Sequence, residues 1–131
     1  CVRAGLCVCV CLTFFAGGFF GGVMARAEQI FPEFVPLLKP IKSRQFNGNL
    51  DKTGRAQIAA KTGTLNFVSA LGGYQISEGR KIAFAIFVQD FGKRAKVDHA
   101  TTDRPRGASD WAKRARRLHH GLLYRWARME Y

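Results

Sequence analysis

The sequence predicts an α+β fold in which three consecutive antiparallel strands are covered by a long carboxy-terminal helix. Apolar residues alternate along residues 81–91, a glycine-bearing turn separates this segment from an apolar segment before it, and apolar residues recur every three or four positions after residue 109. The chain has 131 residues, of which 47% are hydrophobic, so it can form at most one modest domain.

Residues 1–27 are typical of a secretory signal peptide. Arg3 precedes an uncharged run from Ala4 to Met24, and the small residues of Ala25-Arg26-Ala27 resemble a cleavage site. We therefore expect export to the periplasm or cell envelope and a mature chain that starts at Glu28. A membrane anchor is an alternative, although four glycines make the run a poor helix. Sequence introduced by a frameshift or gene rearrangement is another.

The first residue is Cys1 rather than methionine, so we expect the chain to be a fragment of a longer protein. All four cysteines lie within the first eleven residues, and the remaining chain therefore can form no disulfide. Their neighbours are Val, Leu and Phe, with no His, Asp or Glu nearby to complete a metal site. The sequence indicates no metal and no organic cofactor.

Residues 28–55 join this first segment to the strands. Pro32, Pro36 and Pro40 exclude a regular helix through the apolar patch between residues 30 and 41. We expect a short helical turn or an extended segment there, followed by an exposed polar loop over residues 43–55.

The strands are expected at 56–61, 67–77 and 81–91. The first enters a Thr-Gly-Thr turn, the second is rich in Val, Leu and Tyr, and the third is apolar on both alternating faces, so it should lie inside the sheet. Ser77-Glu78-Gly79-Arg80 supplies a hairpin turn between the last two strands. Residues 92–107 are polar and basic, and we expect them to cross the surface.

A helix is expected from residue 109 onward. Ser109 is a suitable N-cap, and Asp110 is favourably placed in the first turn. The apolar residues that should face the sheet are Trp111, Ala115, Leu118, Leu122, Trp126 and Met129. The residues that should face solvent are Lys113, Arg114, Arg116, Arg117 and Arg128.

The charge of the chain indicates an anionic partner. Lys and Arg outnumber Asp and Glu by 21 to 9, which gives a net charge of +12. A nucleic acid, a phospholipid surface and acidic wall polymers all fit this charge. No phosphate-binding loop, zinc-finger spacing or RNA-binding signature accompanies it, so specific nucleic-acid binding is disfavoured.

The tripeptide Lys-Thr-Gly occurs twice, and its context separates the two copies. Lys52-Thr53-Gly54 lies in a polar loop, whereas Lys61-Thr62-Gly63 ends a strand-like run and continues into Thr64-Leu65 and then Ser69-Ala70-Leu71-Gly72-Gly73-Tyr74. Penicillin-recognising serine enzymes place this tripeptide on the strand beside the active site. The second copy is therefore the candidate site.

Residues 61–87 resemble the D-alanyl-D-alanine carboxypeptidase/endopeptidase family of class C penicillin-binding proteins. The resemblance extends more loosely through Arg-Pro-x-Gly-Ala-Ser and the Trp-Ala-Lys-Arg-Ala-Arg helix, and it covers about residues 56–130. It implies a β-lactamase/penicillin-binding-protein-like antiparallel sheet with packed helices. Of that sheet, residues 56–131 would hold only the last three strands and the closing helix.

The resemblance also implies a site. The substrate would be a peptidoglycan stem peptide ending in D-Ala-D-Ala, and β-lactams would bind the intact parent enzyme. Lys61 would supply a cation, while Thr62 and Thr64 could donate hydroxyls from one face of the strand. Gly63 would let the substrate backbone approach, and the Thr64 N–H would complete the oxyanion hole.

The chain departs from the family at the nucleophile. Neither Ser-x-x-Lys nor Ser-x-Asn occurs around any serine, namely Ser43, Ser69, Ser77 and Ser109. We therefore expect a carboxy-terminal fragment of a serine peptidase that is inactive by itself. The competing hypotheses are a noncatalytic basic protein associated with a membrane or the cell wall, and a small basic nucleic-acid-binding domain.

The three histidines do not form a predicted site. His119 and His120 are adjacent on the helix, so their side chains point about a hundred degrees apart. His99 lies in the polar crossing. All three are expected at the surface.

Overall fold

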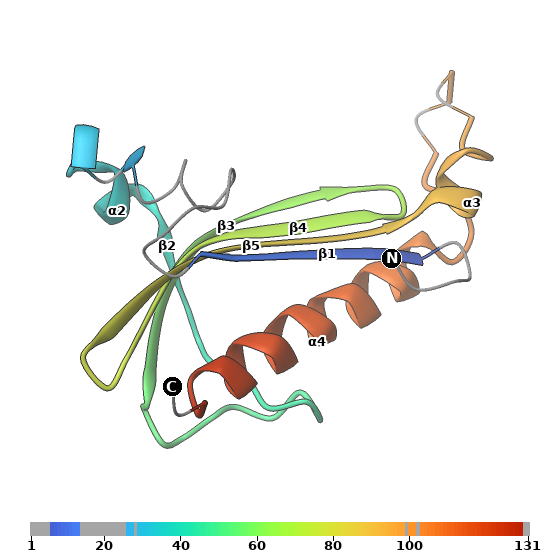
Figure 1. The fold of residues 1–131 in the computed structure, drawn as a ribbon. Helices are drawn as coiled ribbons and strands as arrows, with labels where there is room; N and C mark the ends of the chain where they lie inside the picture. The colour runs from blue at the N-terminus through green and yellow to red at the C-terminus, as the bar shows by residue number, and fades with distance from the viewer. Residues whose placement is uncertain (1–5, 14–25, 28, 99, 102, 130–131) are drawn as a thin grey trace.

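The fold is described by a computed structural model, which covers residues 6–13, 26–27, 29–98, 100–101 and 103–129 (Figure 1). It contains a five-stranded antiparallel sheet in the order β1-β5-β4-β3-β2. The strands are β1 (Leu6–Thr13), β2 (Lys39–Ile41), β3 (Ala56–Leu65), β4 (Val68–Ser77) and β5 (Arg80–Asp90), and the helices are α2 (Phe34–Leu37), α3 (Phe91–Arg94) and α4 (Ala108–Trp126). The predicted α+β class is confirmed.

The three predicted strands are present, but the predicted sheet is incomplete, because β1 and β2 extend it on both sides. β5 is apolar on both faces and pairs with β4 on one edge and with β1 on the other. The alternation of cysteine with valine or leucine along residues 7–12 agrees with a strand there. β2 forms although it contains Pro40, as edge strands allow.

Two tight turns connect the long strands. In the β4–β5 turn, Glu78 and Gly79 have φ values of 51° and 76°, the pattern of the hairpin turn that matches strand twist. In the β3–β4 turn, Phe67 has a φ of 59°. Its buried ring meets Trp111 edge-on, with ring centroids 6.1 Å apart. This packing holds a bulky residue in a backbone conformation that glycine usually adopts.

One face of the sheet packs against α4, which crosses it diagonally (Figure 1). The predicted apolar stripe of α4 contacts this face, and its buried or half-buried members include Trp111, Leu118 and Trp126. On the sheet side the centre of the core is Phe84 and Ile86, which have no exposed surface. Apolar burial of this extent is the main source of stability for such a layer.

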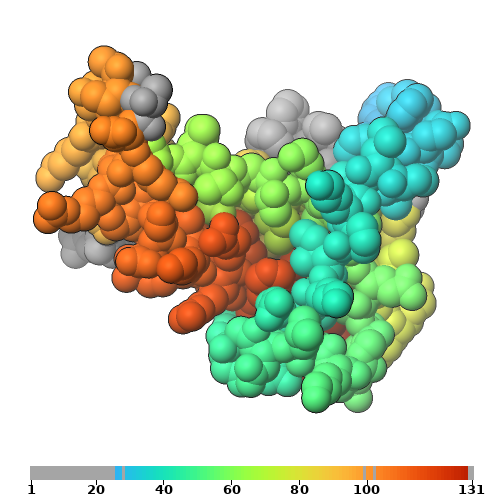
Figure 2. Space-filling model, turned by 180° about the vertical axis from the view of Figure 1, so that it is seen from behind, coloured from blue at the N-terminus to red at the C-terminus, as the bar shows by residue number. Residues whose placement is uncertain are grey.

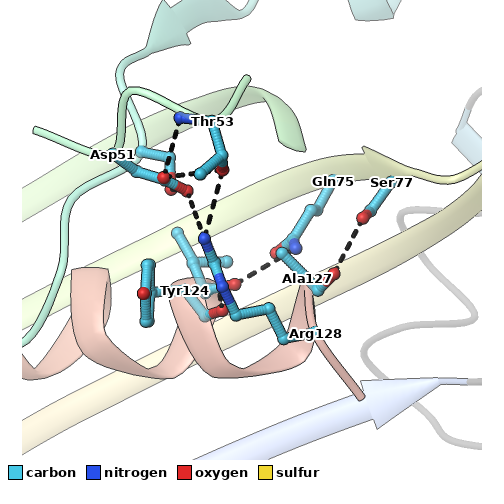
Figure 3. Close-up of polar contacts among 9 residues, drawn as sticks. Asp51, Thr53, Gln75, Ser77, Tyr124, Ala127 and Arg128 are labelled. Carbon is cyan, nitrogen blue, oxygen red and sulfur yellow. Dashed lines mark hydrogen bonds and ion pairs between the residues drawn. The ribbon is translucent and has the colours of Figure 1, made fainter. Parts of the chain in front are cut away.

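Polar side chains from the β4–β5 hairpin bind backbone carbonyls at the end of α4 (Figure 3). Gln75 Nε2 donates to the Leu123 carbonyl at 3.1 Å, and Ser77 Oγ donates to the Ala127 carbonyl at 3.0 Å. Arg80 Nη2 donates to the Met129 carbonyl at 3.0 Å. These bonds satisfy carbonyls near the helix end and fix α4 against the hairpin.

The opposite face of the sheet has a smaller apolar cluster. Leu38, Tyr74 and Ala83 are buried there, and Phe34 and Val35 of α2 pack against them. α2 and β2 lie in the proline-bearing segment for which the sequence predicts a short helical turn or an extended segment.

Several predicted boundaries are wrong by a few residues. β3 does not end at Lys61 but continues to Leu65, because its residues stay paired with β4 in register. α4 begins at Ala108, whose side chain is buried, and its N-cap is Gly107 with a φ of 78°. Ser109, the predicted N-cap, therefore lies inside the first turn.

Most of residues 1–27 lies outside the described residues, and so do Ala25 of the predicted cleavage motif Ala25-Arg26-Ala27 and Glu28, the predicted start of the mature chain. Within the part of the chain that the structure describes, no helix has the length and apolar character needed to cross a membrane.

Candidate functional site

Lys61, Thr62, Gly63 and Thr64 lie in the second half of β3, and all four are exposed. Thr62 is paired with Leu71 and Thr64 with Ser69, both of which face α4. The two threonines therefore share one face of the strand, as expected, at a place that α4 leaves uncovered. Lys61 and Gly63 belong to the opposite face.

This half of β3 also has a free edge. β2 pairs with β3 only from Ile58 to Ala60, and among the described residues no strand continues along residues 61–65 on that side. The other edge is fully occupied by β4. An extended strand with one unpaired edge offers backbone N–H and C=O groups to an extended peptide.

No contact within the described chain requires glycine at position 63. Its φ is not in the left-handed region, and an added Cβ would lie 3.6 Å from the Ala70 Cβ, an ordinary van der Waals distance. Among the described residues, Lys61 Nζ donates only to the neighbouring Thr62 carbonyl, at 3.3 Å. Neither residue is committed to the packing of the fold.

The other copy of the tripeptide has a structural role. Asp51 accepts hydrogen bonds from the Thr53 N–H at 3.1 Å and from Thr53 Oγ1 at 2.7 Å. The guanidinium group of Arg128 stacks over the Tyr124 ring, and its Nη2 forms an ion pair with Asp51 at 3.0 Å (Figure 3). Burial alone would raise the pKa of Asp51, but the bonds from Thr53 and Arg128 outweigh it and lower this pKa to about 2.

Arg128 was predicted to face solvent. It is instead half-buried, because it follows the last turn of α4 and turns toward the loop at residues 51–53.

No serine of the chain stands at the exposed part of β3 as a nucleophile would. Ser69 is the neighbour of Thr64 across the β3–β4 pair, but only 2% of its surface is exposed and it faces the helix side. Ser77 is bonded to α4, Ser43 donates to Asp51 at 3.4 Å, and Ser109 lies on the first turn of α4.

The prediction that His119 lies at the surface is wrong. His119 is 2% exposed, and burial together with the adjacent His120 lowers its pKa to about 4. Its spacing of four residues from Ala115 and from Leu123 places it on the core face, a signal that was present in the sequence. Its Nε2 has no hydrogen-bond partner in the part of the chain that the structure describes. Across the described residues, no three His, Cys, Asp or Glu side chains gather as a metal site would need.

Comparison with known families decides the affiliation of the chain. The model of the D-Ala-D-Ala carboxypeptidase 3 (S13) family matches residues 42–109, which are 68 of the 131 residues. The chain belongs to this family. The matched residues of the S13 family model include both copies of the tripeptide, all of β3, β4 and β5, and the start of α4. Comparisons with curated proteins and with solved structures give no match.

Membership of the S13 family confirms the resemblance inferred from the residues around Lys61. It associates the chain with hydrolysis of peptides that end in D-Ala-D-Ala, the substrate class of the family.

Proposed function

We propose that this chain is the substrate-binding side of an exported serine-type D-Ala-D-Ala carboxypeptidase/endopeptidase that acts on peptidoglycan stem peptides. The observation that supports the proposal is the free edge of β3 at residues 61–65, where the tripeptide of the family is exposed and uncommitted to packing. The peptide would lie along this edge with its terminal carboxylate near the hydroxyls of Thr62 and Thr64, and Lys61 on the other face of the strand would attract the carboxylate at longer range.

The acyl-enzyme step needs a serine that the chain does not place at this edge. In the intact enzyme, a serine oxygen would attack the D-Ala carbonyl, D-Ala would leave with a proton, and water would release the shortened peptide. The Thr64 N–H would contribute to oxyanion stabilisation. The nucleophile and its activating lysine would come from another part of the parent protein, so this chain is a carboxy-terminal fragment in our proposal.

The direct test is titration of the ¹⁵N-labelled chain with a peptide ending in D-Ala-D-Ala. We expect amide shifts confined to residues 61–65, weakening of binding by about tenfold in Lys61→Ala, and no covalent labelling by a fluorescent penicillin. Lys52→Ala is the matched control, because it removes the same charge from the other copy of the tripeptide, and it should bind normally.

Equal binding of a peptide ending in L-Ala-L-Ala, or equal weakening by Lys61→Ala and Lys52→Ala, would contradict a site on β3. Covalent labelling by penicillin would show that the chain contains its own nucleophile. The DNA upstream of Cys1, translated in all forward frames, should contain Ser-x-x-Lys and Ser-x-Asn; their absence would contradict an active parent.

A further inference from the structure

A basic cavity lies between α4 and the loop that precedes β3, and no residue of β3 lines it. Its volume is about 380 Å³. The α4 residues that line it are Lys113, Arg116, Arg117 and His120, and the loop residues are Arg44, Gln45, Asn47, Gly48 and Asn49. The α4 positions have spacings of three, four and seven from the first, so they form one face of the helix.

The loop is held against α4 and the residues after it at two points, both of which lie, on the α4 side, beyond the lining residues toward the carboxy terminus. The Asp51–Arg128 ion pair fixes its end, and Phe46 packs on Gly121, where an added Cβ would overlap the Phe46 ring. Figure 2 shows this loop, in teal to green, lying against the red part of α4. Within the loop, Arg44 Nη1 donates to the Gly48 carbonyl at 2.8 Å. The cavity is therefore built from two elements in fixed contact.

The lining of the cavity contains cations and neutral amides but no carboxylate. Asp110, which is not part of the lining, pairs with Lys113 at 3.2 Å and is largely exposed. Arg116 and Arg117 make no ion pair among the described residues. Like charges repel one another, and within the described part of the chain no carboxylate pairs with Arg44, Arg116 or Arg117 to offset their charges.

The pKa of His120 reflects this positive potential. The His120 Nδ1 is buried and has no hydrogen-bond partner among the described residues, and the residue lines the cavity. Burial and the charges of Arg44 and Arg116 lower its pKa. An anion in the cavity would accept a hydrogen bond from the protonated ring and would reverse this effect.

We propose that this cavity binds a phosphate group. Three guanidinium groups and one ammonium group can pair with the several oxygens and the double charge of a phosphate monoester, and the amides of Gln45, Asn47 and Asn49 can donate to the same oxygens. The phosphate can belong to a soluble molecule or to a lipid headgroup at a membrane surface. The inference does not depend on peptide binding at β3, since the two sites share no residue.

The test is an NMR titration of the full chain with inorganic phosphate at low ionic strength. Phosphate should raise the pKa of His120 by about one unit and shift the amides of residues 44–49. The titratable and charged groups that face His120 are Arg44, Lys113, Arg116 and Arg117, which line the cavity with it, and His119 beside it on α4; the charges of Arg44 and Arg116 lower its pKa. Absence of any His120 response to phosphate would overturn the proposal.

Charge-removing variants distinguish phosphate binding in the cavity from nonspecific attraction of phosphate to a basic chain. Arg116→Gln and Arg117→Gln should each weaken phosphate binding by about tenfold. Arg125→Gln removes the same charge from an exposed position of α4 outside the cavity, and it should weaken binding less than twofold. Equal losses in Arg116→Gln and Arg125→Gln would overturn the proposal.

Gly121→Ala tests the loop, because it keeps every charge and displaces the Phe46 ring. We expect weaker phosphate binding in a folded protein, and unchanged binding would overturn a cavity that includes the loop.

A vesicle-binding experiment distinguishes a lipid phosphate from a soluble one. It compares vesicles that contain phosphatidic acid with vesicles of equal charge that contain phosphatidylglycerol. Preference for phosphatidic acid that Arg116→Gln abolishes indicates a lipid phosphomonoester, and binding of inorganic phosphate without that preference indicates a soluble one.

Discussion

Residue 63 is a glycine, although no contact within the described chain requires the absence of a side chain there. The Cβ of an alanine there would touch Ala70 at 3.6 Å, and the backbone needs no left-handed conformation. Because the fold does not require glycine at this position, a ligand that binds beside the strand can determine which residue is suitable. This separates Gly63 from Gly73, ten residues later, where the fold itself requires glycine.

Gly63→Ala should therefore leave stability nearly unchanged and weaken binding of the D-Ala-D-Ala peptide. We expect a change in unfolding free energy within about 0.5 kcal/mol, since the new methyl group makes only an ordinary contact. Peptide binding should fall because the methyl group stands on the strand that the peptide would approach. Urea denaturation and peptide titration of the same variant measure the two effects, and unaltered peptide binding would place the substrate elsewhere.

His119 gives the folded chain a dependence on pH. The folded-state pKa of His119, about 4, lies below the ordinary value of 6.5. Between these two pH values, His119 therefore binds a proton more readily in the unfolded chain than in the folded chain. Stability from this group is fully present above pH 6.5 and is lost as the pH falls toward 4. Between pH 7 and pH 5 the expected loss is about 2 kcal/mol.

Replacement of His119 by phenylalanine, which has no proton to bind, should remove most of this loss. Urea midpoints at pH 7 and pH 5 provide the measurement, with His120→Gln as the comparison on the less buried neighbour. An unchanged pH dependence in His119→Phe would mean that other groups cause it.

At the scale of elements, the hairpin of β3 and β4 depends on close approach at Gly73. An added Cβ there would meet the Ala59 carbonyl oxygen and the Ala60 Cα, which are backbone atoms and cannot swing aside. At Gly72 the nearest atom would be the Phe84 carbonyl oxygen at 3.7 Å. The strand therefore has space for a methyl group at Gly72 but not at Gly73.

Gly73→Ala should cost about 1–3 kcal/mol of unfolding free energy, whereas Gly72→Ala should be neutral within about 0.5 kcal/mol. Thermal unfolding of the two variants under identical conditions checks the difference. Similar melting temperatures would show that β3 and β4 separate enough to admit a methyl group at either place.

The elements with strong periodicity could be predicted from the sequence, and those defined by tertiary pairing could not. The alternation in 81–91 located β5 to within one residue at each end, and the apolar stripe located the start of α4 to within one residue, although the stripe continues to Met129, beyond the end of the helix at Trp126. β2 has only three residues with a central proline, and its strand conformation comes from pairing with β3. The end of β3 was missed for the same reason, since residues 62–65 are exposed and only their pairing with β4 keeps them extended.

The candidate site was predictable because its residues are contiguous. Lys61 to Thr64 form one motif whose context identified the family and separated it from the loop copy at Lys52. The basic cavity joins the loop before β3 to α4, about seventy residues apart in the sequence, so no local pattern indicates it. The Asp51–Arg128 pair was missed for the same reason.

At the scale of the whole molecule, the exposed end of β3 combines an unpaired edge with apolar surface. Leu65 is 61% exposed beside that edge, and Phe87 is 40% exposed on the same face of the sheet. Such a surface favours association of strands between molecules, and the high net charge opposes it. We therefore expect reversible association of the isolated chain that strengthens with added salt, because salt screens the repulsion but leaves the apolar edge intact.

Leu65→Lys should raise the dissociation constant of this association by about tenfold, since it places a charge at the unpaired edge. Leu37→Lys adds the same charge at a leucine of α2 that is 72% exposed and lies outside this edge, so it should have little effect. Sedimentation velocity over a concentration series distinguishes the two variants. If the chain stays monomeric at every concentration and salt level, the edge is protected in solution. Equal effects of both lysines would mean that net charge, rather than the edge of β3, controls association.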